Sequence, residues 1–389
     1  MTPAIAIIGG GPCGLTLARL LERKGIDYVV YERNENESST QAGGSLDLHV
    51  ETGQRAVREA GLFEEFKKHA RWDDGVLSFC DKEGKKLVEL GQERDLPEID
   101  RRELRHLLLE SVPKEKIHWG HALKSATLGE NGSPVLEFTN GFKCSGFKLV
   151  VGADGAWSKL RSLVTDARPQ YYGVHYIESK IYHGSPAYEA VSSKVKRGTM
   201  VAIGSGKAML IQRQGDGHYR MYFAVPVHED FARSGIVDLS NVEATRAMFL
   251  SPEYYSDWAE DFKNIIQHSV DFYSWPLYNT LPETVKWKHV PGVTLAGDAA
   301  HTSTPFAGEG VNCAMTDAWA LASKIAAYGT EGLDRAVREY EEEMFTRGVD
   351  LITRSARNGE LIFHKEGPEA MLRAVEGGLF KARVDNNGQ

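Results

Sequence analysis

The sequence has few cysteines, no long apolar run and no excess of positive charge. Its four cysteines, Cys13, Cys80, Cys144 and Cys313, lie far apart and form no Cys-x-x-Cys pair, so neither a disulfide framework nor a metal site is encoded. With 46 Lys and Arg against 54 Asp and Glu, the net charge is −8, and we expect no nucleic-acid partner. No apolar run approaches the roughly 20 residues that cross a bilayer. We therefore expect no membrane partner, and a cytoplasmic location.

The chain is long enough for two to three domains or one composite fold, because domains hold roughly 100 to 200 residues. It has 389 residues, of which 42% are hydrophobic and 26% are charged, as is typical of a globular enzyme. A monomer is compatible with this composition.

A glycine-rich turn follows the first apolar run. Residues 4–8 are apolar and rich in β-branched side chains, which predicts a buried parallel strand. The turn reads Gly9-x-Gly11-x-x-Gly14 and leads into helical spacing that ends at Gly25. The glycines permit a tight turn, a close approach of a pyrophosphate and the packing of helix on strand.

An acidic residue completes this β-α-β unit. A second predicted strand, residues 28–31, ends in Glu32, which can bind a ribose diol, and Arg33 beside it can pair with a phosphate or stack on adenine. A lone glycine motif is weak, but its place after a buried strand and before an acid favours a dinucleotide. FAD and NAD are not separated by this unit.

Two more strands end in an aspartate. Asp154 comes shortly after the predicted strand 148–151, and Asp298 shortly after residues 292–296. Past Asp298, the loop from Pro305 to Asn312 opens a helix that we expect to start near Cys313. Either aspartate alone could be a helix cap. Three such strand ends over nearly 300 residues indicate one extended cofactor.

The remaining patterns predict an α/β fold with an α+β substrate domain. We expect helices over Asp47–Glu59, 100–109, 241–250, 255–267 and 331–364, and a hairpin over 76–90. The predicted antiparallel sheet covers residues 170–287. A resemblance to FAD-dependent aromatic hydroxylases implies that residues 1–72, 96–168 and 288–325 form a Rossmann-like FAD-binding domain. It also implies that residues 73–95 and 169–287 form a substrate domain and that residues 326–389 form a bridging helical segment.

The three strand-end motifs resemble the signatures of single-component FAD-dependent aromatic hydroxylases. Within that class the sequence is most similar to the TetX-like, tetracycline-inactivating monooxygenases. The stretches that carry this resemblance are Gly43 to His49, Pro97 to Leu104, and Asp298 to Asn312. It extends from the first strand to about residue 365 and is weak over 170–287.

The resemblance implies a role for each matching residue. Glu32 would bind the adenosine ribose and Arg33 would lie near adenine, Asp47 and Arg101 would face the flavin side, and Asp298 would bind the ribityl chain or pyrophosphate. The pyrophosphate turn and the remaining loop positions would complete the FAD site: Gly9, Gly11, Pro12, Cys13, Gly14, Asp154, Pro305, Gly308, Gly310, Val311 and Asn312.

The loop from Gly308 to Asn312 would present backbone N–H groups to the flavin carbonyl edge. A helix N-terminus carries about half a positive charge, which stabilises an anionic reduced flavin. Glu309 departs from the usual neutral residue, and because its carboxylate would oppose that anion, we expect it to point to solvent. We expect His301 to make a structural hydrogen bond rather than act as an acid or base.

The predicted function is an NAD(P)H-consuming monooxygenase. FAD carries the chemistry: NADPH, bound transiently, would reduce it, O₂ would form a C4a-hydroperoxide, and one oxygen would pass to an electron-rich aromatic, enolic or polyketide substrate, including tetracyclines. No residue is assigned as catalytic, while Pro305 and Phe306, followed by Ala307, would shape the flavin pocket. The candidate substrate-binding residues are Glu178, Arg220, Met221, Phe223 and Phe306.

Several alternatives remain open. A non-catalytic flavoprotein or ligand carrier would keep the FAD motifs, and a flavin oxidoreductase without oxygen insertion is possible. A disulfide reductase would need a redox cysteine pair, and an NAD-dependent dehydrogenase would leave the segment Asp298–Asn312 without a task. Thr199 stands where the resemblance leads us to expect an arginine that binds tetracycline.

Overall fold

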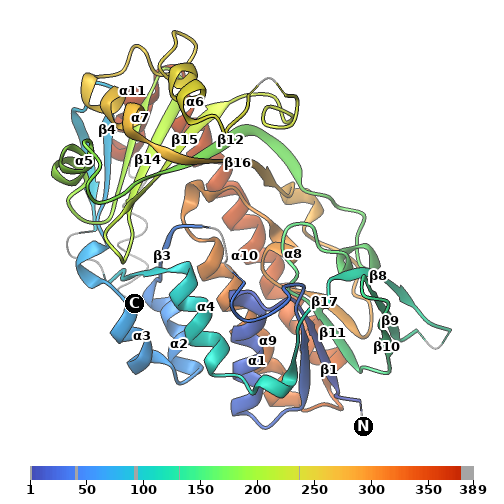
Figure 1. The fold of residues 1–389 in the computed structure, drawn as a ribbon. Coiled ribbons are helices and arrows are strands. Elements are labelled where there is room, and N and C mark those ends of the chain that lie inside the picture. Colours follow the sequence, from blue (N-terminus) through green and yellow to red (C-terminus); the bar gives the residue numbers. More distant parts are fainter. Residues whose placement is uncertain (1, 40–42, 92–94, 131, 236, 378–389) are drawn as a thin grey trace. The chain divides into compact units, whose positions relative to one another are not determined.

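The protein is described by a computed structural model that covers residues 2–39, 43–91, 95–130, 132–235 and 237–377 (Figure 1). Two compact units make up the chain. Unit 1 contains Met1–Ala70, Arg101–Gln170 and Tyr278–Ser355, and unit 2 contains Arg71–Asp100, Tyr171–Leu277 and Ala356–Gln389. Residues 378–389 of the predicted C-terminal segment lie outside the described residues. The functional assignment of each unit stays a prediction.

Unit 1 is built on a five-stranded parallel sheet in the order β17-β11-β1-β2-β7. These strands are Val293–Leu295, Leu149–Gly152, Ile5–Ile8, Tyr28–Tyr31 and Ile117–His118. Every residue of β1, β2, β11 and β17 is buried, as expected of parallel strands covered on both faces. The predicted α/β fold class is therefore confirmed. Unit 1 also holds β3 (Ser45–Asp47) and the antiparallel strands β8 (Leu123–Leu128), β9 (Pro134–Phe138) and β10 (Lys143–Ser145).

The helices of unit 1 pack against this sheet and against one another. They are α1 (Pro12–Arg23), α2 (Arg55–Glu59), α3 (Phe63–His69), α4 (Arg101–Glu110), α8 (Asp298–His301), α9 (Gly310–Tyr328) and α10 (Leu333–Ile362), whose last turns belong to unit 2. Pro12 occupies the first position of α1, where its missing N–H costs no hydrogen bond. Gly25, at φ +64°, follows the end of α1, as predicted.

The predicted helix over Asp47–Glu59 is wrong in its first half. Asp47 ends β3, residues Val50–Gln54 form one π-helical turn, and only Arg55–Glu59 is α-helical. The reason is tertiary: the side-chain oxygen of Asn312 accepts hydrogen bonds from the backbone N–H groups of His49 and Gly53. These bonds hold the chain in a conformation that local spacing does not show.

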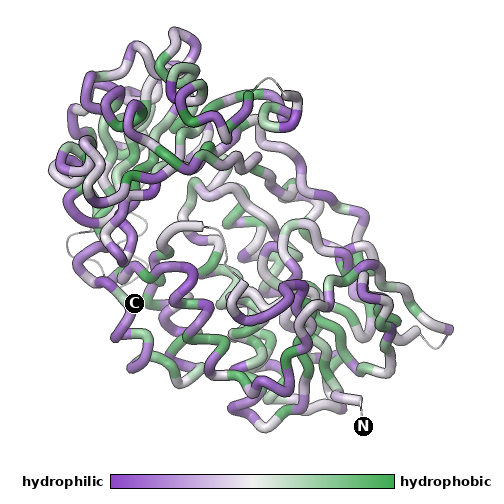
Figure 2. Tube along the Cα trace, viewed as in Figure 1, coloured by the Kyte–Doolittle hydropathy of each residue, from purple (hydrophilic) through white to green (hydrophobic). Residues whose placement is uncertain are grey.

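Unit 2 contains a seven-stranded sheet in the order β16-β12-β15-β14-β13-β4-β5. The strands are Val270–Asn279, Gln170–Ile181, Tyr219–Pro226, Lys207–Arg213, Thr199–Gly204, Leu77–Asp81 and Lys86–Leu90, and β6 is Glu98–Asp100. Its helices are α5 (Tyr188–Val195), α6 (Val242–Phe249), α7 (Glu260–His268) and α11 (Gly367–Glu376). Apolar residues, green in Figure 2, run along the central strands β14 and β15.

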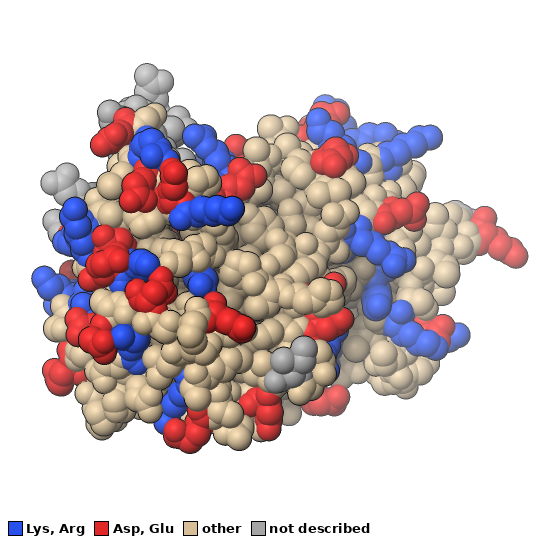
Figure 3. Space-filling view, turned by 90° about the horizontal axis from the view of Figure 1, so that it is seen from above, with Lys and Arg blue, Asp and Glu red and all other residues tan. Residues whose placement is uncertain are grey.

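Most long elements follow their sequence patterns. The hairpin of β4 and β5 and the helices α4, α6 and α10 lie close to the predicted ranges. Helix α7 begins at Glu260, later than predicted, and α3 and α5 were missed. Helix α11 lies within the predicted helical segment 326–389. Among the described residues, no helix combines the length and the apolarity needed to cross a membrane. On the face drawn in Figure 3, acidic and basic side chains are interspersed.

Candidate FAD site

Three loops meet at the carboxyl edge of the parallel sheet of unit 1. They follow β1, β11 and β17, which are neighbours in the sheet. A Cβ atom on Gly9 would lie 2.3 Å from the carbonyl oxygen of Ala153, and one on Gly297 would lie 3.4 Å from the Sγ of Cys13. The loops carrying the three predicted motifs are therefore in contact.

The first turn is shaped for a close ligand. A Cβ on Gly14 would lie 2.0 Å from the carbonyl oxygen of Gly9, so this glycine is required by packing. In contrast, a Cβ on Gly11 would meet no atom of the described residues within 4 Å. The open space at Gly11 and the N-terminus of α1 behind it fit an incoming pyrophosphate. The Cys13 side chain is buried, and its burial raises the pKa of the thiol.

Glu32 is buried and already bound to the backbone. Its two carboxylate oxygens accept hydrogen bonds from the N–H groups of Gly10 and Asn34. Each oxygen retains a second lone pair, which a ribose hydroxyl can use. Arg33 beside it is exposed. These positions fit the adenosine end of FAD.

A buried arginine that was not selected from the sequence joins the second and third loops. Arg161 donates from Nε to the carbonyl of Ala299 at 2.8 Å, from Nη1 to Ala156 at 2.7 Å and from Nη2 to Asp298 at 3.0 Å. It leaves the Asp298 carboxylate exposed at the sheet edge. The position of Asp298 fits binding of the ribityl chain or the pyrophosphate.

Asp154 has a visible structural task. Its Oδ2 accepts from the N–H of Lys159 at 2.9 Å, which closes the turn after β11. Its Oδ1 is buried without a hydrogen-bond partner among the described residues, and burial raises the pKa of this carboxyl. A direct contact of Asp154 with the cofactor stays a prediction.

Asn312, at the start of α9, ties this helix to the segment after β3. Its Oδ1 accepts from the N–H of His49 at 2.9 Å, the N–H of Gly53 at 3.2 Å and the hydroxyl of Thr52 at 3.2 Å, while its Nδ2 donates to the Asp47 carbonyl at 2.8 Å. It is only 1% exposed. Asn312 therefore holds the end of the predicted flavin loop, Gly308–Asn312, against the segment after β3.

Asp47 and Arg101 each have a close neighbour within unit 1. The Asp47 carboxylate lies 3.0 Å from Nε2 of His49, a partner that the sequence did not indicate. A Cβ on Gly43 would lie 2.7 Å from Nε of Arg101, and the φ of +119° at Gly43 also favours glycine. The glycine thus gives the arginine room.

The loop before α9 combines open glycines with a helix N-terminus. A Cβ atom added to Gly308, which has a φ of +68°, or to Gly310 would meet no atom of the described residues within 4 Å. Pro305 is exposed, and Phe306 and Val311 are half-buried, whereas Ala307 is buried. Free N–H groups at the start of α9 fit the electron-rich carbonyl edge of a flavin.

The prediction that Glu309 points to solvent is wrong. Both of its carboxylate oxygens bind the guanidinium of Arg354, at 2.8 and 2.7 Å, and its side chain is 17% exposed. The prediction did not include Arg354 of α10, which lies 45 residues further along the chain and neutralises Glu309.

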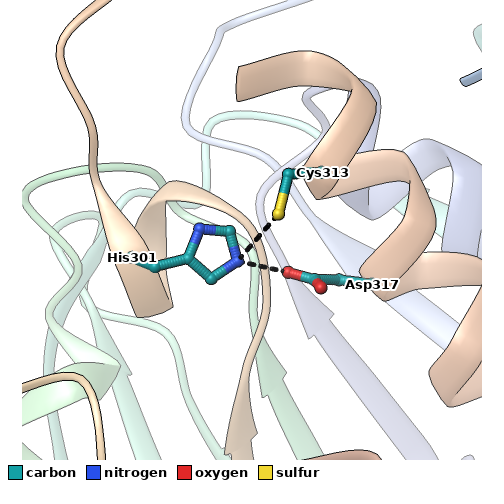
Figure 4. A group of neighbouring side chains, drawn as sticks. All are labelled: His301, Cys313 and Asp317. Atoms are coloured by element: carbon teal, nitrogen blue, oxygen red, sulfur yellow. Dashed lines mark hydrogen bonds and ion pairs between the residues drawn. The ribbon is translucent and has the colours of Figure 1, made fainter. Parts of the chain in front are cut away.

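His301 lies in a buried cluster with Cys313 and Asp317 (Figure 4). Its Nε2 is 2.6 Å from Asp317 Oδ2 and 3.8 Å from the Cys313 sulfur. Burial alone lowers the pKa of His301, but Cys313 and the Asp317 carboxylate outweigh it and hold the pKa well above its usual value. His301 makes a structural hydrogen bond, as expected.

The same cluster also has the composition of a metal-ligand set, since its ligand atoms all lie within 4.8 Å of one another. However, Asp317 Oδ2 also accepts from the N–H of Gly297 at 2.9 Å, and its Oδ1 accepts from Arg347 at 2.9 Å. A cation would have to displace these bonds beside the positive Arg347. We therefore assign the cluster to holding α8, α9 and α10 together.

The candidate substrate residues divide between two faces of the sheet in unit 2. Arg220 binds Glu178 at 2.6 Å, and Glu178 also accepts from Nε1 of Trp275 at 2.9 Å. Met221 and Phe223, fully buried in the apolar core of unit 2, lie on the opposite face. The prediction that all four line one chamber is therefore wrong, because neighbouring strand residues point in opposite directions.

The chain belongs to the family described as "FAD binding domain", which matches residues 1–249 and 261–355. Monooxygenase asqM of Emericella nidulans is 29% identical over 427 residues, covering 94% of this chain and 96% of that protein. The 3-amino-4-hydroxybenzoate 2-monooxygenase PtnB3 of Streptomyces platensis is 28% identical, covering 95% and 91%. The crystal structure of tetracycline destructase Tet(51) has a TM-score of 0.71 at 20% identity, covering 97% and 95%, and supports the fold alone.

Fold, family and site together define a single-component FAD-dependent monooxygenase of the aromatic hydroxylase class. The open glycines, the buried Glu32 and the exposed Asp298 fit FAD. The predictions of an enzyme, of the class and of FAD as a cofactor are confirmed.

Proposed function

We propose that the protein uses NADPH and O₂ to insert one oxygen atom into an electron-rich aromatic, enolic or polyketide small molecule. The single observation that carries this proposal is the meeting of the three loops at one sheet edge. One extended cofactor fits across all three. The names of the relatives support oxygen insertion and an aromatic substrate.

FAD, when bound, supplies the redox chemistry and the activation of oxygen. The chain's part is to bind and orient it. The turn at Gly11 would accept the pyrophosphate, Glu32 the ribose, and Asp298 the polar chain leading to the flavin. The loop Gly308–Asn312 would direct N–H groups at the edge where negative charge develops on reduction.

We place the substrate contacts on the polar face of the sheet in unit 2. Glu178 and Arg220 neutralise one another, and Glu178 also binds the Trp275 ring N–H. Nearby, the rings of Tyr176 and Tyr222 lie 5.3 Å apart. A neutral polar patch with aromatic surfaces favours a planar substrate rich in hydroxyl and keto groups over a strongly charged one.

Reduction and product analysis test the proposal on the purified holoprotein. NADPH and NADH are compared as donors without oxygen, by bleaching of the flavin absorbance, with and without candidate substrates. Phenols, aminohydroxybenzoates and tetracyclines are then incubated with NADPH and air. The expected result is a product about 16 mass units heavier, as one transferred oxygen atom requires.

The outcomes separate the candidate functions. Isotopically labelled O₂ should label the product. Bleaching followed only by hydrogen peroxide release, across all of these substrates, would favour a flavin oxidase. A yellow protein that neither donor reduces would favour a carrier. Lack of turnover with every tetracycline would remove this class of substrate alone.

A further inference from the structure

One ion pair lies directly against the predicted flavin loop, and no step described above uses it. Glu309 immediately precedes Gly310, the first residue of α9. Its two oxygens are held by Arg354 of α10 in a two-pronged pair, at 2.8 and 2.7 Å. Such paired bonds fix direction as well as distance. The guanidinium is held in turn by Asp350, whose Oδ2 lies 2.7 Å from Nε.

Helix α10 contacts the loop segment 304–309, which leads into the predicted flavin loop Gly308–Asn312, at three places. The hydroxyls of Ser355 and Thr304 lie 2.8 Å apart at the start of the loop. Leu351 packs with Ala307 and Cys313 in a small buried cluster at its centre. Arg354 holds Glu309 at its end. Residues 351–355, one turn of α10, thus support the whole segment 304–309.

The charges matter because of where Glu309 stands. The free N–H groups at the N-terminus of α9 carry a partial positive charge that favours a negative ligand. An unpaired carboxylate at the adjacent residue would cancel much of this potential. Burial lowers the pKa of Arg354, but Glu309 and Asp350 outweigh burial and raise it, so the guanidinium stays charged. Arg354 therefore neutralises the negative charge of Glu309 next to the N-terminus of α9.

We propose that Arg354 is a positioning residue that, by neutralising Glu309 and anchoring its loop to α10, sets the reduction potential of the bound FAD. This inference rests on the proposed placement of the flavin beside residues 308–312. It predicts that the pair acts by charge: losing Arg354 disfavours the reduced, anionic flavin, and losing Glu309 favours it.

The test compares the reduction potentials of FAD in purified holoproteins, measured without substrate or NADPH by equilibration with a reference dye. In Arg354→Met the site should prefer reduced flavin about tenfold less than in the wild type, which is a potential about 30 mV lower for a two-electron couple. Glu309→Gln alone should move the potential upward. The double variant Arg354→Met/Glu309→Gln should return close to the wild-type value.

Arg338→Met is the matched control. Arg338 also lies on α10 and also binds, through Nε, an aspartate four residues earlier, Asp334 at 2.9 Å, but it does not contact the flavin loop. Its potential should equal that of the wild type. If Arg354→Met fails to retain FAD, Glu309→Gln still tests the inference, because it removes charge and keeps the shape.

The results distinguish charge from scaffolding. If Arg354 is purely structural, Arg354→Met weakens FAD binding and lowers the melting temperature. Adding Glu309→Gln then does not restore the potential in the double variant. That outcome, or a potential unmoved by both single variants, overturns the inference. A wild-type protein that binds no FAD would overturn the proposed function instead, and the two failures are therefore distinct.

Discussion

Replacing Asn312 by alanine tests how far one buried side chain holds the predicted flavin loop. The amide makes four hydrogen bonds, three through Oδ1 and one through Nδ2. Asn312→Ala leaves the N–H groups of His49 and Gly53 without their acceptor. Asn312 is only 1% exposed, so the site of the lost side chain is buried. The start of α9 and the segment after β3 would then lose the four side-chain hydrogen bonds that join them.

The expected loss of stability is about 3 kcal/mol. Each buried polar group that loses its partner costs about 1 to 3 kcal/mol, and water entering the vacated space recovers part of this. For a unit of roughly 200 residues, this corresponds to a melting temperature lower by about 6 to 12 °C. Calorimetry on FAD-free protein measures it, and titration with FAD should show at least about tenfold weaker binding.

Asn140→Ala provides the comparison. Asn140 is an exposed asparagine of unit 1 whose side chain also bonds to the backbone, at Gly120 and Phe142. Its loss should cost no more than about 1 kcal/mol, since water replaces the exposed bonds. A melting temperature of Asn312→Ala within 2 °C of that of Asn140→Ala, a difference of about half a kcal/mol, would refute the assignment of Asn312 as a residue that holds the loop.

Four further substitutions have distinct expected outcomes. Gly11→Ala should leave the melting temperature of the FAD-free protein unchanged and weaken FAD binding at least about tenfold, whereas Gly14→Ala should lower both, because its Cβ would lie 2.0 Å from the Gly9 carbonyl oxygen. His301 has a raised pKa in the folded state, so its stabilisation is full below about pH 6.5 and is lost as the pH rises through that raised value. The stability advantage of wild type over His301→Gln, from urea unfolding, should therefore shrink from pH 6 to pH 9, and an advantage that grows would contradict the charged pair. Glu178→Gln should raise KM for the identified substrate about tenfold, with an unchanged potential of the flavin.

The sequence predicted those parts of the site that depend on neighbouring residues. The strand β1, the turn after it and the end of α1 at Gly25 follow from spacing, because buried strands and helix ends have local signals. The aspartates at the ends of β11 and β17 were found in the same way. Their meeting followed from a general property of parallel sheets, in which carboxyl ends share one edge.

Partners distant along the chain left no such signal. The hydrogen bonds of Asn312 to His49 and Gly53 span about 260 residues, and they changed a predicted helix into a strand and a π-helical turn. Glu309 was misplaced for the same reason, since nothing near it in the sequence indicates Arg354. Arg161 was not selected from the sequence, because its three carbonyl acceptors emerge only from the fold.

For the candidate substrate-binding residues, the sequence contained a local rule that the prediction did not apply. Arg220, Met221 and Phe223 lie on one strand, so the period of two already separates Arg220 from the other two. Met221 pairs with Ser179 across β12, and Arg220 pairs with Lys180, so Glu178 reaches Arg220 along a diagonal. A carboxylate that meets both a guanidinium and an indole N–H is already neutralised. A substrate that binds there must therefore compete through shape and neutral hydrogen bonds, and a carboxylate-bearing analogue should bind no better than its amide.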